Sequence, residues 1–383
     1  MAALPSYFDR FLQEIRPTKN QREDMRSGHR TLRERLAAWE PLKATIVSDF
    51  LQGSYRRATA VRPVRDQRSD VDIVIVTNLD SAKTNPHEAL ELFRSFVKEY
   101  YPGKYKFQGR SIGIELSYVE LDLVVTAAPS EVDKKALRFE AVRSWDTPED
   151  VDDWRLNAFW VSVENREYLA AQSRLFKAAV EQEWKTEPLL IPDRDAQKWG
   201  KTHPLVQIAW TFDKNRITDR HYVNVVKAIK WWRRERHPEP EHPKSYPLEH
   251  MIGDCCPDGI ASVAEGIVGT LEGIRDRFSD DAQAGRVPFL PDRGVPENNV
   301  LKRVEAVDFV RFHQQVVAAA GLAREAFDAD TVESARLWRE LLGSRFPEPP
   351  RGDGCAAGGS GSGVVGGFTE RTEYSVPPRG RLG

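Results

Sequence analysis

Hydrophobic and polar residues follow two different periods along the chain, and the first segments have the period of a helix. Apolar residues recur at helical spacing in residues 6–16, and again in a longer segment that ends before Pro41. Thr18 and Gln21 open the longer segment with the spacing of a capping box. The pattern therefore predicts a short helix and then a long one. The long helix either joins two lobes as a backbone or packs on a sheet as an ordinary amphipathic helix, and the pattern favours neither.

Short runs rich in β-branched residues predict a sheet after these helices. The runs cover residues 46–51, 70–76, 104–117 and 118–126. Residues 86–101 lie between the second and third runs and have the apolar spacing of a helix. We therefore expect a β-α-β-β lobe in this part of the chain.

The rest of the chain is expected to be mostly helical, after a segment of weak signal. Residues 128–202 are polar, and periodicity assigns no elements to them. Within this segment, residues 189–194 and 199–204 resemble ordered loops. After His203 the apolar spacing predicts these helices: 221–236, one that starts near Pro247, 258–278, 303–327 and 330–343.

The C-terminal residues 347–383 differ in composition from everything before them. They contain ten of the 25 glycines of the chain. Such a segment cannot bury enough apolar area to offset the entropy lost on ordering, so we expect a flexible tail. The predicted domains are a catalytic lobe (1–202) that includes the long helix, a helical lobe (203–346) and the tail (347–383).

The composition excludes several classes of protein. A net charge of −2 gives the whole chain no attraction to nucleic acid or to a membrane, so any anion-binding surface has to be local. Cys255 and Cys256 are adjacent and Cys355 lies in the tail, which is neither a disulfide framework nor a zinc spacing. No signal peptide opens the chain, and no apolar run approaches membrane-spanning length. We expect a reduced, cytoplasmic protein.

Two apolar runs on either side of a polar loop carry residues typical of a nucleotide and metal site. The first run ends in Gln52, Gly53 and Ser54, and the second begins with Asp70 and Asp72. Alternate residues of a strand share a face, so the two carboxylates are expected side by side, where they repel each other unless a cation lies between them. Oxygen ligands without nearby Cys or His favour Mg²⁺. Gly53 permits a close backbone approach to an anion, and Ser54 is placed to open a helix whose N–H groups face phosphate.

A third carboxylate, Asp122, lies within an apolar run, where an unpaired charge is costly. Three carboxylates are able to hold two metal ions, which activate an attacking hydroxyl and stabilise the departing pyrophosphate. By themselves, Asp70 and Asp72 are more typical of a strand that simply starts after a polar loop. Their combination with a preceding Gly-Ser and a later Asp122 favours the metal site.

The polar loop between the two apolar runs is basic. It contains these five arginines: Arg56, Arg57, Arg62, Arg65 and Arg68. Beside a triphosphate site they would form an anion funnel, and a solvated basic loop is an equally good interpretation.

Two further groups of residues have both a structural and a functional interpretation. In the predicted helix 221–236, Lys227, Lys230 and Arg234 share a face beside an apolar stripe, a pattern more typical of solvated side chains. By pattern alone, Ser245 is best explained as the N-cap of the helix that starts near Pro247.

Taken together, these residues resemble one protein family. A Gly-Ser pair, a spacer, the Asp70 and Asp72 pair and an acid on a later strand form the pattern of the polymerase-β-like nucleotidyltransferases. Residues 51–63 and 70–73 are more closely similar to the bacterial cGAS/DncV-like nucleotidyltransferases (CD-NTases), the second-messenger synthases of CBASS anti-phage operons. The resemblance extends from about residue 5 to residue 346. Similarity to clade D in particular rests on these segments: 16–18, 31–36, 118–124, 230–233 and 246–250.

The resemblance implies an α+β fold of two lobes, a mixed-sheet nucleotidyltransferase lobe and a C-terminal helical lobe. It implies that Asp70, Asp72 and Asp122 are the catalytic acids and bind two Mg²⁺ ions. The implied reaction is the attack of a ribose 3′-hydroxyl on the α-phosphate of ATP, with GTP as a second substrate. Repetition of this step would close a cyclic trinucleotide or dinucleotide that activates a downstream effector. No membrane and no stably bound nucleic acid is expected as a partner.

The resemblance also assigns nucleotide-binding residues on both lobes. Three residues match the motif that holds the donor triphosphate: Gln52, Gly53 and Ser54. Lys230 and Ser245 match residues of the helical lobe that contact nucleotide phosphates. Tyr246 is expected to stack on a base, a role that suits an aromatic face.

Two other functions are compatible with the same motifs. One is a linear transferase that adds a nucleotide to a tRNA, a protein or a small molecule. The chain lacks an extended basic, aromatic-rich RNA surface outside the spacer, which favours the cyclase. The other is a nucleotide sensor or scaffold without catalysis, which three intact carboxylates argue against.

The end of the tail resembles a ubiquitin-like terminus. The last residues are Arg-Gly-Arg-Leu followed by Gly383. The resemblance implies that an E1–E2-like enzyme conjugates the chain through Gly383. A long flexible segment would let the terminal carboxylate enter a narrow adenylation site, and a terminal glycine has no Cβ atom to clash there. An ordinary disordered terminus is the alternative.

Overall fold

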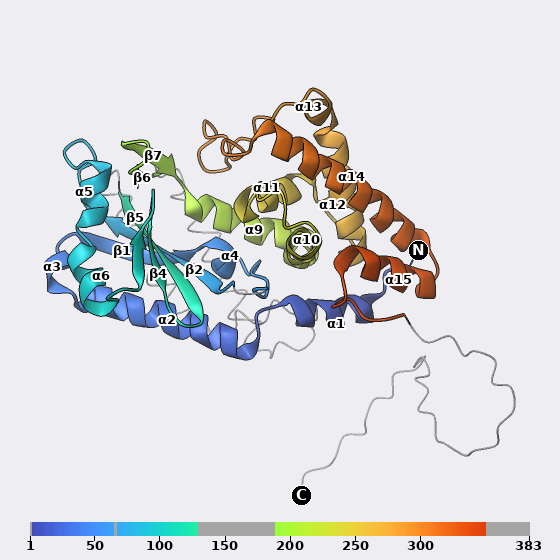
Figure 1. Cartoon of the computed structure of the whole chain (residues 1–383), viewed down its shortest axis with the longest axis horizontal. Helices are drawn as coiled ribbons and strands as arrows, with labels where there is room; N and C mark the ends of the chain where they lie inside the picture. The colour runs from blue at the N-terminus through green and yellow to red at the C-terminus, as the bar shows by residue number, and fades with distance from the viewer. Residues whose placement is uncertain (1, 65–66, 129–187, 350–383) are drawn as a thin grey trace, which may run out of the picture. The chain divides into compact units, whose positions relative to one another are not determined.

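A computed structural model describes residues 2–64, 67–128 and 188–349 of the chain. By its internal contacts the chain divides into two units, Met1–Pro349 and Pro350–Gly383, and the second lies outside the described residues. The predicted tail and its terminal Gly383 therefore stay predictions. Within the first unit, a sheet and a group of helices can be told apart (Figure 1).

The described strands form one mixed sheet in the order β1-β2-β5-β4-β3, and β6 and β7 extend it from β5. Their bounds are β1 Ile46–Gln52, β2 Ser69–Thr77, β3 Tyr105–Phe107, β4 Ile112–Glu115, β5 Val119–Ala127, β6 Leu189–Asp193 and β7 Lys198–Thr202. β2 and β5 are parallel, whereas β1 and β4 are antiparallel to their neighbours. The second halves of β2 and β5 are buried on both faces, which explains their continuous apolar sequence.

Except for α1, the helices of the first part of the chain cover the sheet or connect its strands. Their bounds are α1 Pro5–Ile15, α2 Lys19–Ala38, α3 Glu40–Lys43, α4 Gly53–Arg56, α5 Pro86–Glu91 and α6 Arg94–Tyr100. The predicted capping box is confirmed, since Thr18 and Gln21 exchange hydrogen bonds at the start of α2. Met25 and Leu32 of α2 pack into the core of the sheet.

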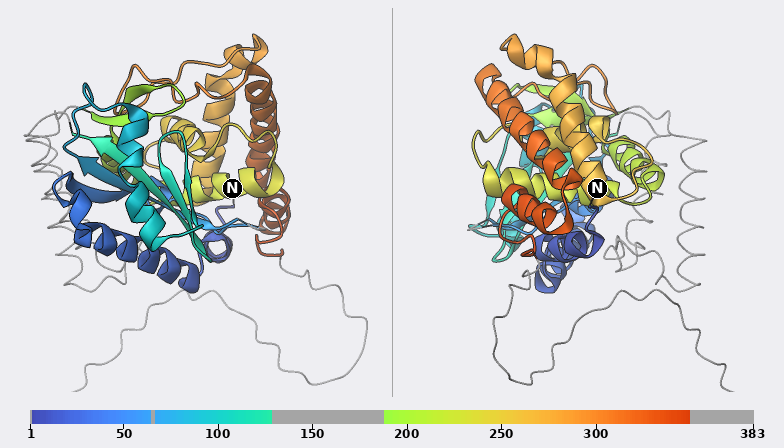
Figure 2. Two further views of the ribbon diagram at one scale, coloured as in Figure 1. Left: turned by 60° about the vertical axis from the view of Figure 1, so that its left-hand side comes forward. Right: turned by 90° about the vertical axis from the view of Figure 1, so that its right-hand side faces the viewer.

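The helices of the second part form a core of their own. Their bounds are α9 Pro204–Ile217, α10 Tyr222–Arg236, α11 Ser245–Cys255, α12 Val263–Arg277, α13 Ser279–Gln283, α14 Ala306–Asp328 and α15 Thr331–Leu342. The helices coloured yellow to red stand apart from the blue-green sheet in Figure 2, left. Phe8 and Phe11 of α1 also belong to this helical core and pack on Phe346. The consecutive helices α1 and α2 thus pack in different cores.

Three predictions about local structure are wrong. The run 104–117, predicted as one strand, forms β3 and β4, which pair with each other as an antiparallel hairpin. Residues 86–101 form two short helices instead of one, because the chain turns at Leu92 and Phe93. The segments 189–194 and 199–204, interpreted as loops, contain the hairpin of β6 and β7. The hairpin joins the sheet where Leu190 pairs with Ala127 of β5, and its own sequence has little strand periodicity. The predicted helices after His203 are confirmed, within a few residues at their ends.

Among the described residues, no helix combines the length and the apolar character that crossing a membrane requires.

Candidate active site

Four carboxylates gather at one end of the central strand pair. β2 and β5 run parallel, and their register places Asp72 beside Asp122 and Asp70 beside Glu120. The residues between these acids are buried, while the acids themselves are partly or fully exposed. Because alternate residues of a strand share a face, all four side chains lie on the same side of the sheet. The three acids predicted from the sequence are therefore neighbours.

Negative charge is poorly compensated at this point. The pKa of Asp70 is raised to about 8, first by desolvation and then by repulsion from Asp72 and Asp122. Desolvation also raises the pKa of Asp122 to about 6, although Gln108 donates a hydrogen bond to its Oδ1 (3.2 Å). Water still reaches the side chain of Asp70, so its desolvation is partial. The carboxylates are therefore expected to attract a cation.

The carboxylates of Asp70, Asp72 and Asp122 are suitable ligands for a divalent metal ion, although their side chains are not arranged around a common metal position. In residues 2–64, 67–128 and 188–349, no group of three or more His, Cys, Asp or Glu side chains is arranged to hold a metal. Asp70, Asp72 and Asp122 are nevertheless adjacent by register, and each has a raised pKa. Hard carboxylate oxygens with excess negative charge are the ligands that Mg²⁺ prefers. These three carboxylates are therefore the groups that would hold such an ion.

The turn after β1 is fitted closely to Asp72. Gln52 ends β1 and pairs with Asp72 in the antiparallel register. Gly53 follows with a φ of +72°, and a Cβ atom at this position would lie 1.7 Å from Oδ2 of Asp72. Only glycine has neither a Cβ atom nor a penalty in this backbone region. The turn that carries Gln52, Gly53 and Ser54 therefore lies directly against the carboxylates.

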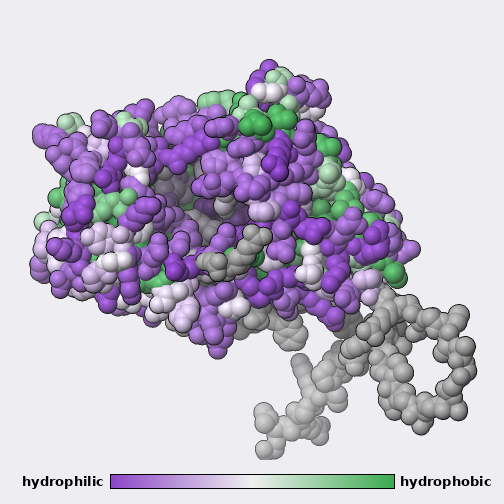
Figure 3. Space-filling view, viewed as in Figure 1, coloured by the Kyte–Doolittle hydropathy of each residue, from purple (hydrophilic) through white to green (hydrophobic). Residues whose placement is uncertain are grey.

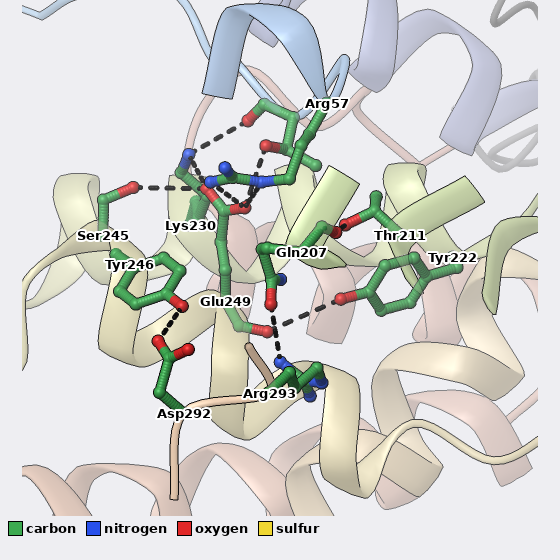
Figure 4. Close-up of polar contacts among 11 residues, drawn as sticks. Arg57, Gln207, Thr211, Tyr222, Lys230, Ser245, Tyr246, Glu249, Asp292 and Arg293 are labelled. Atoms are coloured by element: carbon green, nitrogen blue, oxygen red, sulfur yellow. Dashed lines mark hydrogen bonds and ion pairs between the residues drawn. The ribbon is translucent and has the colours of Figure 1, made fainter. Parts of the chain in front are cut away.

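The buried carboxylate of Glu249 connects this turn to the helices (Figure 4). Its Oε2 accepts hydrogen bonds from Arg57 Nη2 (3.1 Å) and from Thr59 Oγ1 (3.0 Å), two residues that follow α4. Its Oε1 accepts from Lys230 Nζ (2.7 Å) on α10 and from Ser245 Oγ (3.4 Å) at the start of α11. The network thus joins the segment after Gly53 to the helical core.

The network also lies close to the carboxylates. Desolvation raises the pKa of Asp72, and the positive charges of Arg57 and Lys230 oppose this rise. Lys230 likewise opposes the rise in the pKa of Asp70. The acids of the sheet and the cations of the network therefore share one electrostatic environment.

Two structural interpretations of the sequence are wrong at this site. Lys227 and Lys230 are 5% and 6% exposed, so they are not solvated side chains. The other helices cover α10 so completely that all of its residues from Tyr222 to Arg233 are buried. Ser245 is not an N-cap, because α11 begins at Ser245 itself and Lys244 precedes it. The predicted contacts of Lys230 and Ser245 with nucleotide phosphates stay predictions.

The arginines of the polar loop mostly have partners within the chain. Arg57 pairs with Glu249, and Arg68 lies 3.2 Å from Glu115. Arg62 Nε donates a hydrogen bond to the carbonyl oxygen of Arg16 (3.1 Å). The guanidinium of Arg56 lies 5.4 Å from the ring centre of Phe212. Arg65 lies outside the described residues. The described arginines therefore do not form a fully solvated loop, and their role as an anion funnel stays a prediction.

The ring of Tyr246 is held in place by polar neighbours. Its hydroxyl donates to Asp292 Oδ2 (2.5 Å), and the guanidinium of Arg57 lies 5.9 Å from its ring centre. Nearby, Arg293 stacks on Trp210 at 3.6 Å from the ring centre. Figure 3 shows the face seen in Figure 1 as largely hydrophilic, with a recess between the strands and the helices.

Sequence reasoning missed Glu249, Asp292 and Arg293 as site residues. Glu249 had a detectable signal, because it stands one helical turn after Ser245 in a helix whose neighbouring residues are mostly apolar. Asp292 and Arg293 lie in a loop, where no periodicity marks them.

The chain is similar to known proteins in sequence and in fold. Residues 2–130 match the Second Messenger Oligonucleotide or Dinucleotide Synthetase domain. A cyclic AMP-AMP-GMP synthase of Enterobacter hormaechei subsp. hoffmannii is 45% identical over 384 residues, which cover 98% of each chain. A probable cyclic AMP-AMP-GMP nucleotide synthase of Salmonella paratyphi B is 46% identical over 383 residues, again 98% of each chain. The structure of the Bradyrhizobium diazoefficiens CD-NTase CdnG in complex with GTP has a similar fold, with a TM-score of 0.63 at 13% identity, covering 89% of this chain and 95% of that one.

Proposed function

The chain belongs to the cGAS/DncV-like nucleotidyltransferases, a family of cyclic-oligonucleotide synthases, and we propose that it joins ATP and GTP into cyclic AMP-AMP-GMP. Two relatives that match it over 98% of their length carry this product in their names. The ring size and the bases are part of the proposal, as is membership of clade D.

The single observation that carries the proposal is the parallel register of Asp72 and Asp122, with Asp70 on the same face. A binding protein gains nothing from adjacent acids when desolvation and mutual repulsion raise the pKa of both Asp70 and Asp122. A transferase needs such a group to hold a cation against the reacting phosphate.

Nucleotidyltransferases of this family use a divalent metal ion. We propose that the ions are two Mg²⁺ and that Asp70, Asp72 and Asp122 hold them. When bound, the metal would polarise the α-phosphate and stabilise the negative charge of the leaving pyrophosphate.

The residues of the chain itself would bind and orient the nucleotides. Gln52, Gly53 and Ser54 would hold the donor triphosphate against the carboxylates, since this turn lies beside Asp72. Lys230 and Ser245 would contact its phosphates from the helical side. Tyr246, fixed by Asp292 at its hydroxyl, would present its ring to a base.

Each step of the reaction forms one P–O bond, breaks the P–O bond to pyrophosphate and releases the hydroxyl proton to solvent. The 3′-hydroxyl of one ribose attacks the α-phosphate of the next nucleotide, its proton is lost, and pyrophosphate leaves. A 3′–5′ phosphodiester bond results. Three such steps, the last within one linear intermediate, would close a cyclic trinucleotide.

The test is a reaction of the full-length chain with all four nucleoside triphosphates and Mg²⁺, analysed by mass spectrometry after phosphatase treatment. We expect a phosphatase-resistant product with the mass of cyclic AMP-AMP-GMP, and none from the Asp70→Asn, Asp72→Asn double variant. A folded double variant that still makes this product would refute the metal assignment. Turnover that requires added RNA or protein would refute the cyclase.

We propose two protein partners, one that modifies the chain and one that responds to its product. An E1–E2-like enzyme would conjugate the chain through Gly383, and the cyclic product would activate a downstream effector. We propose that the chain is divided into a catalytic lobe (1–202), a helical lobe (203–346) and a tail (347–383). The conjugating enzyme would then act on the tail, whose residues are distinct from the catalytic ones.

A further inference from the structure

The two carboxylate oxygens of Glu249 are divided between two parts of the chain. Among the described residues, Oε2 is bonded by Arg57 and Thr59, which follow the Gly53 turn. Oε1 is bonded by Lys230 and Ser245, which belong to the helices. Lys230 closes the network, because its Nζ also donates to the carbonyl oxygen of Thr59 (3.0 Å). One side chain therefore links the segment after the turn to the helices (Figure 4).

The network contains two buried positive charges, on Lys230 and Arg57, and one buried negative charge, on Glu249. Glu249, Lys230 and Arg57 are 3%, 6% and 7% exposed. Burial alone would raise the pKa of Glu249, but Lys230 and Arg57 hold it at about 2, so the carboxylate is ionised at neutral pH. Two cations share this one carboxylate, and both also act on Asp72. Without the charge of Glu249, the nearby carboxylate of Asp72 would attract both.

We propose that Glu249 is a positioning residue that holds Lys230 and Arg57 at the triphosphate-binding turn and away from the carboxylate of Asp72. This role rests on the proposed function, in which Lys230 and Ser245 contact the triphosphate. Lys230 has three N–H groups, and two of them have acceptors among the described residues, so one remains for a phosphate oxygen. Glu249 is saturated by its protein partners and does not itself touch the nucleotide. It therefore controls triphosphate affinity more than the chemical step.

The test replaces Glu249 by glutamine in the full-length chain, which removes the charge and keeps the shape. We expect affinity for inorganic tripolyphosphate and for a non-hydrolysable ATP analogue, measured by calorimetry, to fall at least about tenfold, equivalent to about 1.4 kcal/mol. The KM for ATP should rise more than kcat falls. The matched control is Glu272→Gln, which removes a bidentate pair with Arg324 (2.9 and 2.7 Å) between α12 and α14. It should leave both affinities unchanged.

A second variant covers the case in which Glu249→Gln does not fold. Thr59→Val removes one hydrogen bond to the ionised Oε2 without any change in charge. Because Arg57 and Lys230 still bind Glu249, we expect a loss of affinity of about two- to fivefold, less than the full contribution of a hydrogen bond to a charged group. Wild-type tripolyphosphate affinity in a folded Glu249→Gln variant would overturn the proposal. If that variant is unfolded, wild-type affinity in Thr59→Val would do so. A wild-type chain that makes no cyclic product would refute the proposed function instead, and the tripolyphosphate comparison would still decide the role of Glu249.

Discussion

Gly53 and Asp72 are in such close contact that a Cβ atom on residue 53 would lie 1.7 Å from Oδ2 of Asp72. The backbone of Gly53 also has a φ of +72°, a region that other residues rarely adopt. Two independent constraints therefore require glycine at the turn that lies against the carboxylates.

Gly53→Ala should reduce the rate of product formation by at least about 100-fold, because the added Cβ displaces a carboxylate of the site. Initial rates of pyrophosphate release would measure the effect, with thermal unfolding as a check on the fold. Gly103→Ala is the matched control: its φ is +71°, and a Cβ there would meet no atom within 4 Å. It carries the same backbone strain of about 1–2 kcal/mol and should keep its activity. Equal losses of rate in the two variants would mean that strain, not the contact with Asp72, is responsible.

Asp70→Asn should make the metal-free chain more stable while it removes activity. Desolvation, and after it repulsion from Asp72 and Asp122, raises the pKa of Asp70 in the folded state, and the substitution relieves both costs. In buffer with EDTA we expect a higher Tm than for the wild type. Excess Mg²⁺ should raise the Tm of the wild type and have little effect on the variant, because a ligand that binds only the folded state stabilises it.

The control for this comparison is Asp213→Asn, which removes an exposed carboxylate that lies 3.5 Å from Arg216 on α9. Surface pairs of this kind contribute at most about 1 kcal/mol, so its Tm should change little in either buffer. A metal-free Asp70→Asn variant less stable than the wild type would contradict the prediction.

His29 should make the chain less stable as the pH falls below neutral. It is 9% exposed and packs on the ring of Tyr55, and burial, together with the positive charge of Arg33, lowers its pKa to about 3. The folded pKa is below the unfolded value, so His29 contributes stability that is complete above pH 6.5 and is lost as the pH falls from 6.5 toward 3. At pH 5 the loss is about 2 kcal/mol.

His29→Gln should therefore show a shallower fall in unfolding free energy between pH 7 and pH 5 than the wild type. Urea denaturation at several pH values would measure the slopes, and the comparison uses slopes, so a constant destabilisation by the substitution does not matter. Parallel curves for the two proteins would show that His29 does not control this dependence.

Removal of Leu382 and Gly383 should leave cyclic product formation unchanged and prevent conjugation. The proposed catalytic residues all lie in the unit Met1–Pro349, whereas the carboxylate proposed to react belongs to Gly383. The measurement is thioester formation with an E1–E2-like enzyme and ATP, followed on a denaturing gel. Undiminished conjugation of the truncated chain would refute the role of Gly383.

Features that depend on short spacings could be predicted from the sequence. The capping box of Thr18 and Gln21 is a contact between residues one helical turn apart, so its residues alone determine it. Asp70 and Asp72 share a face because they lie two residues apart in a strand. The two-part fold and the three acids of the sheet followed from such local patterns and from the family resemblance.

Features that depend on residues far apart were decided by the tertiary structure. Asp72 and Asp122 meet only because β2 and β5 pair in parallel with that register. The segments of β6 and β7 were interpreted as loops because they lack the alternation of apolar and polar residues that predicts a strand. Their place in the sheet is defined by the pairing of β6 with β5, which is distant in sequence.

Lys230 is the clearest case of this kind. The pattern around it is typical of a solvated lysine, but the side chain is buried against Glu249 of another helix and Thr59 of the loop after α4. Glu249 and Thr59 are 190 residues apart in the sequence. A charge is tolerated in a protein interior only when its partner is buried with it, and the position of that partner is a property of the whole fold.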